Sequence, residues 1–305
     1  MSDAVLLLAH GTPDVLGEMA EYLNKVTGGR PMPQAVVEEL QHRYAEIGLG
    51  ETVGAVAPPL TYWTMKQAEL LREAMGVPVY VGMRNWKPYI ADTVTQMKAD
   101  GVTRARVVCL APQTSRTSIG LYKRAVMAAA DGMEIDFVEG WAEEPQLIAA
   151  FAERLGAVWG SACAEAGAKV PVLFTAHSVP CRTVQTSAEG VEPDPYSVEA
   201  KRTAALVAAQ MPEIGEWYFA FQSQGVAGGP WIGPTVEDTL RALKEQGAIG
   251  VVIQPVGFVC DHVEVLYDID IAFHATADEI GLKLWRAESL NGSAVLTAAL
   301  VSVAG

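Results

Sequence analysis

Cysteine is scarce in this sequence, and the few that are present are scattered. The 305 residues include four cysteines and no CxxC pair. Structural zinc and iron–sulfur sites need closely spaced thiols or thiols combined with histidines, so this spacing argues against a metal held by thiolates. Disulfide-rich secreted domains carry many more cysteines for their length. We therefore expect reduced thiols in a cytoplasmic protein, at Cys109, Cys163, Cys181 and Cys260.

Positive charge and long apolar runs are also lacking. The chain has 22 lysines and arginines against 36 aspartates and glutamates, a formal net charge of −14. Nucleic acids and anionic lipid surfaces attract basic proteins, so we expect no nucleic-acid partner. No apolar run reaches the roughly 18 residues of a membrane span, and the N-terminus lacks the basic segment and cleavage site of a signal peptide. These absences predict no stable membrane insertion and a cytoplasmic location.

One short phrase occurs twice. Residues 5–13 read VLLLAHGTP and residues 172–180 read VLFTAHSVP, which agree at Val, Leu, Ala, His and Pro. Each copy is typical of a buried strand that runs into a histidine and breaks at a turn. Ligands of open α/β sheets bind where the strands end, so each half of the chain would offer one imidazole to a shared cleft. Chance similarity between two Val/Leu-rich strands is the alternative.

Strand-like and helix-like segments alternate along the chain, which predicts βαβ units and mostly parallel sheets flanked by helices. The length favours two domains, and we place them at residues 1–162 and 163–305. Residues 48–61 lack periodicity and are expected to form a loop at the lip of the cleft. We predict strands at residues 4–9, 77–81, 105–111, 135–138, 170–175, 216–221 and 250–256. We predict helices at residues 34–47, 63–75, 89–99, 118–130, 145–166, 198–211, 236–246 and 289–303, and another that begins near residue 261.

The strongest chemical pattern joins His177 to an acidic segment. His177 follows a predicted strand, and Glu264 and Asp268 are four residues apart in residues 254–270, so they share one helical face. An imidazole beside carboxylates can relay protons or pass on a metal ion. The alternative is an acidic, solvated helix face. The chain has no HExxH motif or other three-ligand zinc pattern, so we expect no permanently bound cofactor, and any metal ion would pass through.

Several distinctive motifs follow one another along the chain. The second half carries AHSVP at 176–180, FQSQGVAGGPWIGP at 221–234 and QPVGFVCDHVEVLYDID at 254–270. The first half carries HGTP at 10–13, GGRPMP at 28–33, HRYAEIG at 42–48, YVGMRNWKPYI at 80–90 and APQTS at 111–115. These motifs resemble, in order and over almost the whole chain, the signature motifs of the ferrochelatase family. The resemblance implies insertion of Fe²⁺, as a substrate, into a porphyrin, and an α/β fold of two Rossmann-like (chelatase-type) halves with a porphyrin cleft between them.

The resemblance assigns roles to three residues of the second half. His177 and Glu264 match the family's catalytic pair, and Asp268 matches the next carboxylate of a metal path. A neutral imidazole can accept a pyrrole proton while a carboxylate delivers Fe²⁺ to a macrocycle bent by the cleft. The family often has a further carboxylate one turn on, where this chain has Ala272, so a longer metal path is not implied.

The resemblance also favours coproporphyrin III over protoporphyrin IX. Arg43 and Tyr44 match an Arg-Tyr pair that contacts porphyrin propionates in the coproporphyrin-type enzymes, and Tyr122 matches another porphyrin-contacting tyrosine. A guanidinium binds carboxylates through paired hydrogen bonds. His10 lies where those enzymes commonly have a tyrosine that binds the iron, and imidazole can fill the same role. Trp231, in a loop between Gly-Pro pairs, is expected to form a wall of the porphyrin cleft.

Three other readings stay open at this point. The enzyme could use protoporphyrin IX. The phrase LLLAHG also resembles small cobalt and nickel chelatases, although these lack DHVEVLYD. The chain could also be a non-catalytic haem-binding protein, with His10 as an iron ligand. For the ferrochelatase, the expected partners are a porphyrin, ferrous iron and haem-pathway enzymes that hand over substrate or product.

Overall fold

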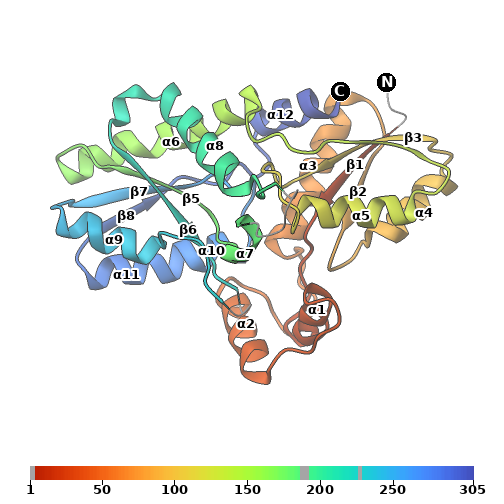
Figure 1. Ribbon diagram of the computed structural model, residues 1–305, viewed down its shortest axis with the longest axis horizontal. Helices are drawn as coiled ribbons and strands as arrows, with labels where there is room; N and C mark the ends of the chain where they lie inside the picture. Colours follow the sequence, from red (N-terminus) through yellow and green to blue (C-terminus); the bar gives the residue numbers. More distant parts are fainter. Residues whose placement is uncertain (1–3, 186–191, 226–228) are drawn as a thin grey trace.

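Two four-stranded parallel sheets lie side by side and form the frame of the molecule (Figure 1). The computed structural model describes residues 4–185, 192–225 and 229–305, so residues 226–228 of the predicted 221–234 motif lie outside the description. The first sheet has the order β2-β1-β3-β4 and the second the order β6-β5-β7-β8. The strands are β1 (Ala4–Ala9), β2 (Val79–Met83), β3 (Arg104–Cys109), β4 (Glu134–Phe137), β5 (Val172–His177), β6 (Trp217–Gln222), β7 (Gly250–Pro255) and β8 (Lys283–Arg286).

The two copies of the repeated phrase form β1 and β5, which occupy the same place in their sheets. All six residues of β1 are buried, as are the first five of β5. Each strand pairs in parallel with a neighbour on both sides, so Val5 lies opposite Val79 and Arg106. Such central strands are covered on both faces, which explains their continuous apolar runs. The structure confirms the predicted α/β fold of two parallel sheets flanked by helices.

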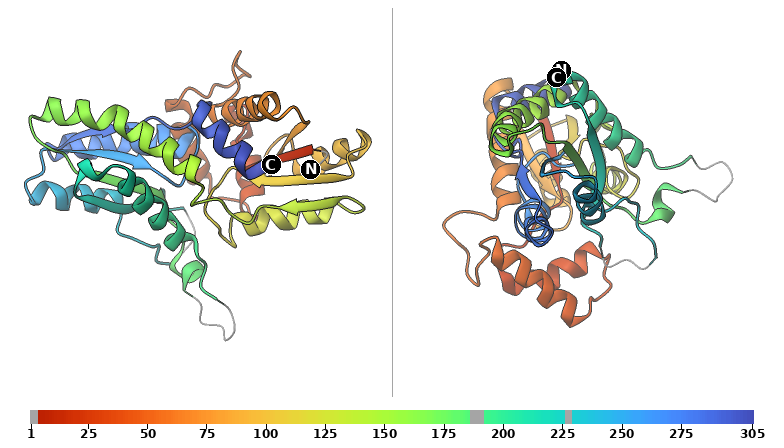
Figure 2. Two further views of the ribbon diagram at one scale, coloured as in Figure 1. Left: turned by 90° about the horizontal axis from the view of Figure 1, so that it is seen from above. Right: turned by 90° about the vertical axis from the view of Figure 1, so that its left-hand side faces the viewer.

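Helices cover both faces of each sheet (Figures 1 and 2). Short turns of 3₁₀ helix occur at Leu16–Glu18 and Pro212–Ile214, and a π-helical segment occurs at Asp268–Phe273. The helices are α1 (Met19–Val26), α2 (Gln34–Glu46), α3 (Pro59–Met75), α4 (Ile90–Ala99), α5 (Ile119–Ala129), α6 (Pro145–Ala166), α7 (Cys181–Val184), α8 (Tyr196–Gln210), α9 (Val236–Glu245), α10 (Val263–Leu266), α11 (His274–Glu279) and α12 (Ala294–Ala304).

Two helices connect the halves. The position between residues 162 and 163 falls inside α6, which continues to Ala166 and ends at Gly167 with φ 72°. Helix α6 packs on β7 and β8 of the second sheet, whereas α12, the last helix of the chain, packs on α3 and β3 of the first and on α6. In the view from above, α12 lies between the two sheets (Figure 2). One apolar cluster therefore includes residues of both central strands, such as Val5 and Val172.

Helix α6 is the one helix among the described residues with the length and apolar composition of a membrane span. Its side chains Leu147, Phe151 and Leu155 are buried in the apolar cluster that both sheets share. The helix also packs against α8 and α12. These contacts are those of a core helix, which passes the same test of length and composition.

A small helical lobe made of α1 and α2 lies beside the two sheets, at the bottom of Figure 1. Met19, Tyr22 and Tyr44 pack there against Trp86, which follows β2. The predicted lip loop at residues 48–61 is too long, because α3 begins at Pro59. Proline is well suited to the first turn of a helix, where its missing N–H would have no partner, and this signal sets the start of α3.

Candidate active site

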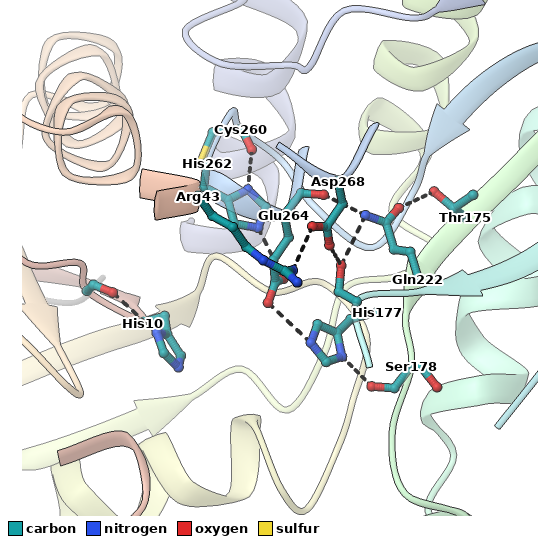
Figure 3. A network of polar contacts seen from close by, with 12 residues as sticks. His10, Arg43, Thr175, His177, Ser178, Gln222, Cys260, His262, Glu264 and Asp268 are labelled. Carbon is teal, nitrogen blue, oxygen red and sulfur yellow. Dashed lines mark hydrogen bonds and ion pairs between the residues drawn. The ribbon is translucent and has the colours of Figure 1, made fainter. Parts of the chain in front are cut away.

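The site lies where β1 and β5 end. His177 is the last residue of β5, and His10 follows β1 directly. Glu264 belongs to the short helix α10, and Asp268 begins the π-helical segment after it. Figure 3 shows His177 pointing toward Glu264, with Asp268 and Arg43 beside them and His10 set apart in the first half. The fold thus brings Arg43 of the first half next to His177, Glu264 and Asp268 of the second.

His177 and Glu264 form an ion pair. The distance from His177 Nε2 to Glu264 Oε1 is 3.2 Å, and both side chains are about one-third exposed (30% and 32%). His177 Nδ1 is hydrogen-bonded to the carbonyl oxygen of Ser178, which can only accept, so Nδ1 carries a proton. Nε2 is therefore the nitrogen that gains or loses the second proton, and it faces the carboxylate.

The ion pair shifts the pKa of both partners. Burial alone would lower the pKa of His177, but the negative charge and hydrogen bond of Glu264 outweigh burial and raise the pKa to about 9. Burial alone would raise the pKa of Glu264, but His177 and His262 hold it well below its usual range. At neutral pH the pair is therefore an imidazolium and a carboxylate, and His177 cannot accept a further proton until it has released one.

Glu264 is held in place by residues that were not predicted from the sequence. His262 Nε2 lies 3.4 Å from Glu264 Oε2, and His262 Nδ1 donates to the carbonyl oxygen of Cys260 at 3.0 Å. Gln222, at the end of β6, donates from Nε2 to the backbone oxygen of Glu264 at 2.6 Å, and its own Oε1 accepts from Thr175. Glu264 is thus held through both its side chain and its backbone. His262 is two residues from Glu264 in the DHVEV motif, the one signal that could have indicated it.

Asp268 lies between a hydroxyl and a guanidinium. Ser223 Oγ donates to Asp268 Oδ2, and Arg43 Nη1 lies 3.5 Å from Asp268 Oδ1. Burial raises the pKa of Asp268 to about 6, despite the hydrogen bond from Ser223, and the nearby Glu264 charge adds to the rise. Arg43 reaches this position from α2 and also lies over the ring of Tyr267, with Cζ 5.1 Å from the ring centroid.

His10 is held in a neutral state. Its Nδ1 lies 3.0 Å from the Tyr22 hydroxyl and 3.2 Å from the Gly11 carbonyl oxygen, so Nδ1 carries the proton. The Asn85 amide nitrogen donates to Nε2 at 2.9 Å. Burial, together with the positive charge of Arg84, lowers the pKa of His10 to about 4. The nitrogen that could bind iron is therefore already occupied by a hydrogen bond.

The predicted aromatic residues lie around these groups at different depths. Tyr44 is buried in the helical lobe, where burial raises its pKa to about 12. Tyr122 is buried beneath Arg84, whose Cζ lies 5.4 Å from the ring centroid. The Trp231 ring centroid is 6.4 Å from that of His177, at a tilted angle. Trp231 thus lies beside the ion pair, and its backbone pairs with Pro180 just after the strand-end histidine.

The described residues contain no group of three or more His, Cys, Asp or Glu side chains placed to hold a metal ion together. Glu264 contacts two histidines, and Asp268 contacts a serine and an arginine. The arrangement can move a proton at His177 Nε2 and offers two carboxylates to a passing cation. That chemistry suits a metal ion that is a substrate.

The fold is similar to that of solved chelatases. SirB from Bacillus subtilis has a TM-score of 0.54 and 13% identity, covering 100% of this chain and 96% of that one. CbiX, described as the terminal enzyme of sirohaem biosynthesis in denitrifying bacteria, has a TM-score of 0.51 and 15% identity, with coverage of 98% and 97%. At such identities the likeness concerns the fold alone.

The sequence comparisons identify the family. The ferrochelatase family model matches residues 2–304. A ferrochelatase of Acidobacterium capsulatum is 60% identical over 99% of this chain and 93% of its own. One of Deinococcus radiodurans is 37% identical, over 98% and 94%. A coproporphyrin III ferrochelatase of Geobacillus kaustophilus is 33% identical, over 98% and 94%. The chain belongs to the ferrochelatase family and is an enzyme that inserts iron into a porphyrin.

Proposed function

We propose that this ferrochelatase uses coproporphyrin III, with His177 and Glu264 as its catalytic pair. The position of Arg43 supports this choice of porphyrin. Its guanidinium reaches the ion-pair network from α2, and its side chain is 36% exposed. Coproporphyrin carries four propionates and protoporphyrin two. A protein with a net charge of −14 needs local cations to hold a tetra-anion, and a guanidinium matches a carboxylate through two parallel hydrogen bonds.

The names of relatives give separate support. Coproporphyrin III ferrochelatases of Geobacillus kaustophilus and Anoxybacillus flavithermus are 33% and 32% identical to this chain over 98% of its length. The relative at 60% identity is named ferrochelatase, without a porphyrin. The choice of substrate therefore depends on residues of the site, and Arg43 is the residue we assign to it.

The proposed reaction uses the geometry of the ion pair. Metallation removes two pyrrole N–H protons and forms four iron–nitrogen bonds. Fe²⁺ that reaches Glu264 competes with the His177 imidazolium for the carboxylate, which favours loss of the Nε2 proton to solvent. The neutral Nε2 then accepts one pyrrole proton, and the second proton passes to solvent as Fe²⁺ binds the four nitrogens. Asp268, one turn beyond Glu264, is the preceding contact for the metal, and the enzyme needs no resident cofactor.

His10, Tyr44, Tyr122 and Trp231 complete the proposed porphyrin-binding set. Trp231 would form an apolar wall beside His177, and His10 would lie on the opposite side, in the first half of the molecule. We expect the porphyrin to arrive from, and the product to pass to, other enzymes of the haem pathway in the cytoplasm.

One experiment tests the substrate and the reaction. Purified protein is offered Fe²⁺ without oxygen, together with coproporphyrin III or protoporphyrin IX, and the loss of free-porphyrin fluorescence is followed. We expect faster metallation of coproporphyrin III. Equal or faster metallation of protoporphyrin IX would contradict the proposed preference, and no metallation of either would contradict the proposed reaction. Arg43→Gln should reduce the preference by raising KM for coproporphyrin III more than for protoporphyrin IX.

A further inference from the structure

Arg43 is held firmly on its own helix and only loosely at the site. Its Nε lies 2.9 Å from Glu39 Oε1, one turn away on α2. Its Nη1 lies 3.5 Å from Asp268 Oδ1, which is longer than the ~2.8 Å of a strong charge-assisted hydrogen bond. The guanidinium also lies over the Tyr267 ring, so Arg43 keeps its contacts with Glu39 and Tyr267 when Nη1 moves away from Asp268.

Asp268 has little access to solvent, and Arg43 contacts one of its two carboxylate oxygens. Its side chain is 10% exposed, and its other oxygen accepts a hydrogen bond from Ser223. An incoming cation thus encounters Arg43 at Oδ1, the Asp268 oxygen that does not bind Ser223. At equal distances from a divalent ion, the guanidinium repels the ion as strongly as the carboxylate attracts it.

The charges of the site balance in this structure. The cations His177 and Arg43 face the carboxylates Glu264 and Asp268. Fe²⁺ approaching this arrangement meets no excess of negative charge. A porphyrin propionate that bound Arg43 would neutralise the guanidinium and draw it away from Asp268, which would leave one uncompensated carboxylate beside Glu264.

We propose that Arg43 exchanges Asp268 for a porphyrin carboxylate, so that porphyrin binding uncovers Asp268 and prepares the site for the metal. The inference rests on the proposed function, because it assumes that Arg43 receives a propionate. It adds an order of events: the porphyrin binds first and the metal second. It also gives the enzyme a means to avoid holding iron when no porphyrin is present.

The test measures Mn²⁺ binding by the loss of its free-ion EPR signal. Nickel coproporphyrin III serves as the porphyrin, because its centre is already filled and its propionates are intact; its own binding is followed by tryptophan quenching. For the wild-type protein we expect Mn²⁺ to bind about tenfold more tightly when nickel coproporphyrin III is present, equivalent to about 1.4 kcal/mol. Mn²⁺ affinity that does not change while nickel coproporphyrin III is bound would overturn the exchange.

Three variants isolate the residues. Arg43→Gln should bind Mn²⁺ more tightly than the wild type without any porphyrin, and nickel coproporphyrin III should add no further increase. Asp268→Asn should show no porphyrin-dependent increase. Glu39→Gln, the matched control, loses the tether on α2 but keeps Arg43, and should retain the increase.

The outcomes separate this inference from the proposed substrate. Failure of nickel coproporphyrin III to bind would contradict the proposed substrate. In that case the Arg43→Gln variant, measured without any porphyrin, still tests whether Arg43 weakens metal binding at Asp268. Unchanged or weaker Mn²⁺ binding by this variant would overturn the inference.

Discussion

The two strand-end histidines have opposite electrostatic surroundings although they occupy equivalent strands. His177 faces the carboxylate of Glu264, which raises its pKa to about 9. His10 is buried near the Arg84 guanidinium, and its pKa falls to about 4. The repeated phrase alone predicted one imidazole at each strand end. The difference between them comes from residues far away in the sequence, such as Arg84 and Glu264, which only the fold brings near.

Replacing His177 tests its assigned role. His177→Ala should lower the insertion rate by at least about 100-fold, the size typical of losing a general base, while the affinity for coproporphyrin III changes little. The rate is measured under anaerobic conditions and the affinity by tryptophan quenching. His274→Ala removes an imidazole from α11, outside the network of Figure 3, and should keep full activity. An active His177→Ala protein would remove His177 from the mechanism.

The buried His10 predicts a pH effect on stability. Its pKa is about 4 in the folded protein, against an ordinary value of 6.5. The unfolded chain therefore binds more protons between these values, and the free energy of unfolding falls as the pH decreases from about 6.5 to about 4. His10→Gln removes this contribution, which is at most about 3 kcal/mol.

The measurement is the urea unfolding free energy of both proteins at several pH values. The stability of His10→Gln relative to the wild type should rise as the pH decreases through that window. Parallel curves for the two proteins would show that His10 is not held neutral by the fold.

At the scale of elements, a π-helical segment follows Glu264, and Arg286 anchors it at Asp270. Arg286, at the end of β8, binds both carboxylate oxygens of Asp270, at 2.5 and 2.9 Å. It also lies 3.4 Å from Asp261 Oδ1. A π-helix is a locally unfavourable conformation that occurs mostly at functional sites, so these contacts help to hold Asp268 in place.

Replacing Arg286 should loosen this segment. Arg286→Gln leaves Asp261 and Asp270 without their cation, and we expect a loss of about 2 kcal/mol in unfolding free energy together with a reduced insertion rate. The double variant Arg286→Gln/Asp270→Asn should recover part of the stability, because it removes one of the unpaired carboxylates. Urea unfolding and the anaerobic rate measure both effects. A single variant as stable and active as the wild type would contradict the anchoring role.

The sequence predicted most elements, and the errors have physical reasons. Strand β1 and helix α6 begin and end as predicted, since the buried apolar run and the Pro and Gly at the helix ends are strong local signals. Strand β8 was missed because its four residues include a charge at each end. Helix α1 was missed because it is short and lies in a small lobe. The Asn85 contact with His10 and the Arg43 contact with Asp268 depend on tertiary structure and have no local pattern.

At the scale of the whole molecule, the two halves share one core. Helix α12 packs on α3 of the first half and α6 beside the second sheet. Its Leu300 is 1% exposed and belongs to the cluster that includes β1 and β5. Arg106 of β3 also donates to the backbone oxygen of Val303 in this helix. We therefore expect the two halves to unfold together.

Leu300→Ala should destabilise the whole protein by about 2–5 kcal/mol, the usual cost of a Leu-to-Ala cavity in a core. Tryptophan fluorescence, which reports on both halves through Trp86 and Trp217, and far-UV circular dichroism should give one coincident urea transition for both proteins. Two separate transitions would show that the halves are independent units.

The position of α12 also matters while the chain is being synthesised. A ribosome releases the first sheet long before α12, and chains add only about 5–20 residues per second. Until α12 emerges, the apolar faces of α3 and β3 that it covers are exposed to water. The first half can therefore complete its core only after α12 has been synthesised. We expect the nascent protein to depend on chaperones that bind apolar surfaces during translation.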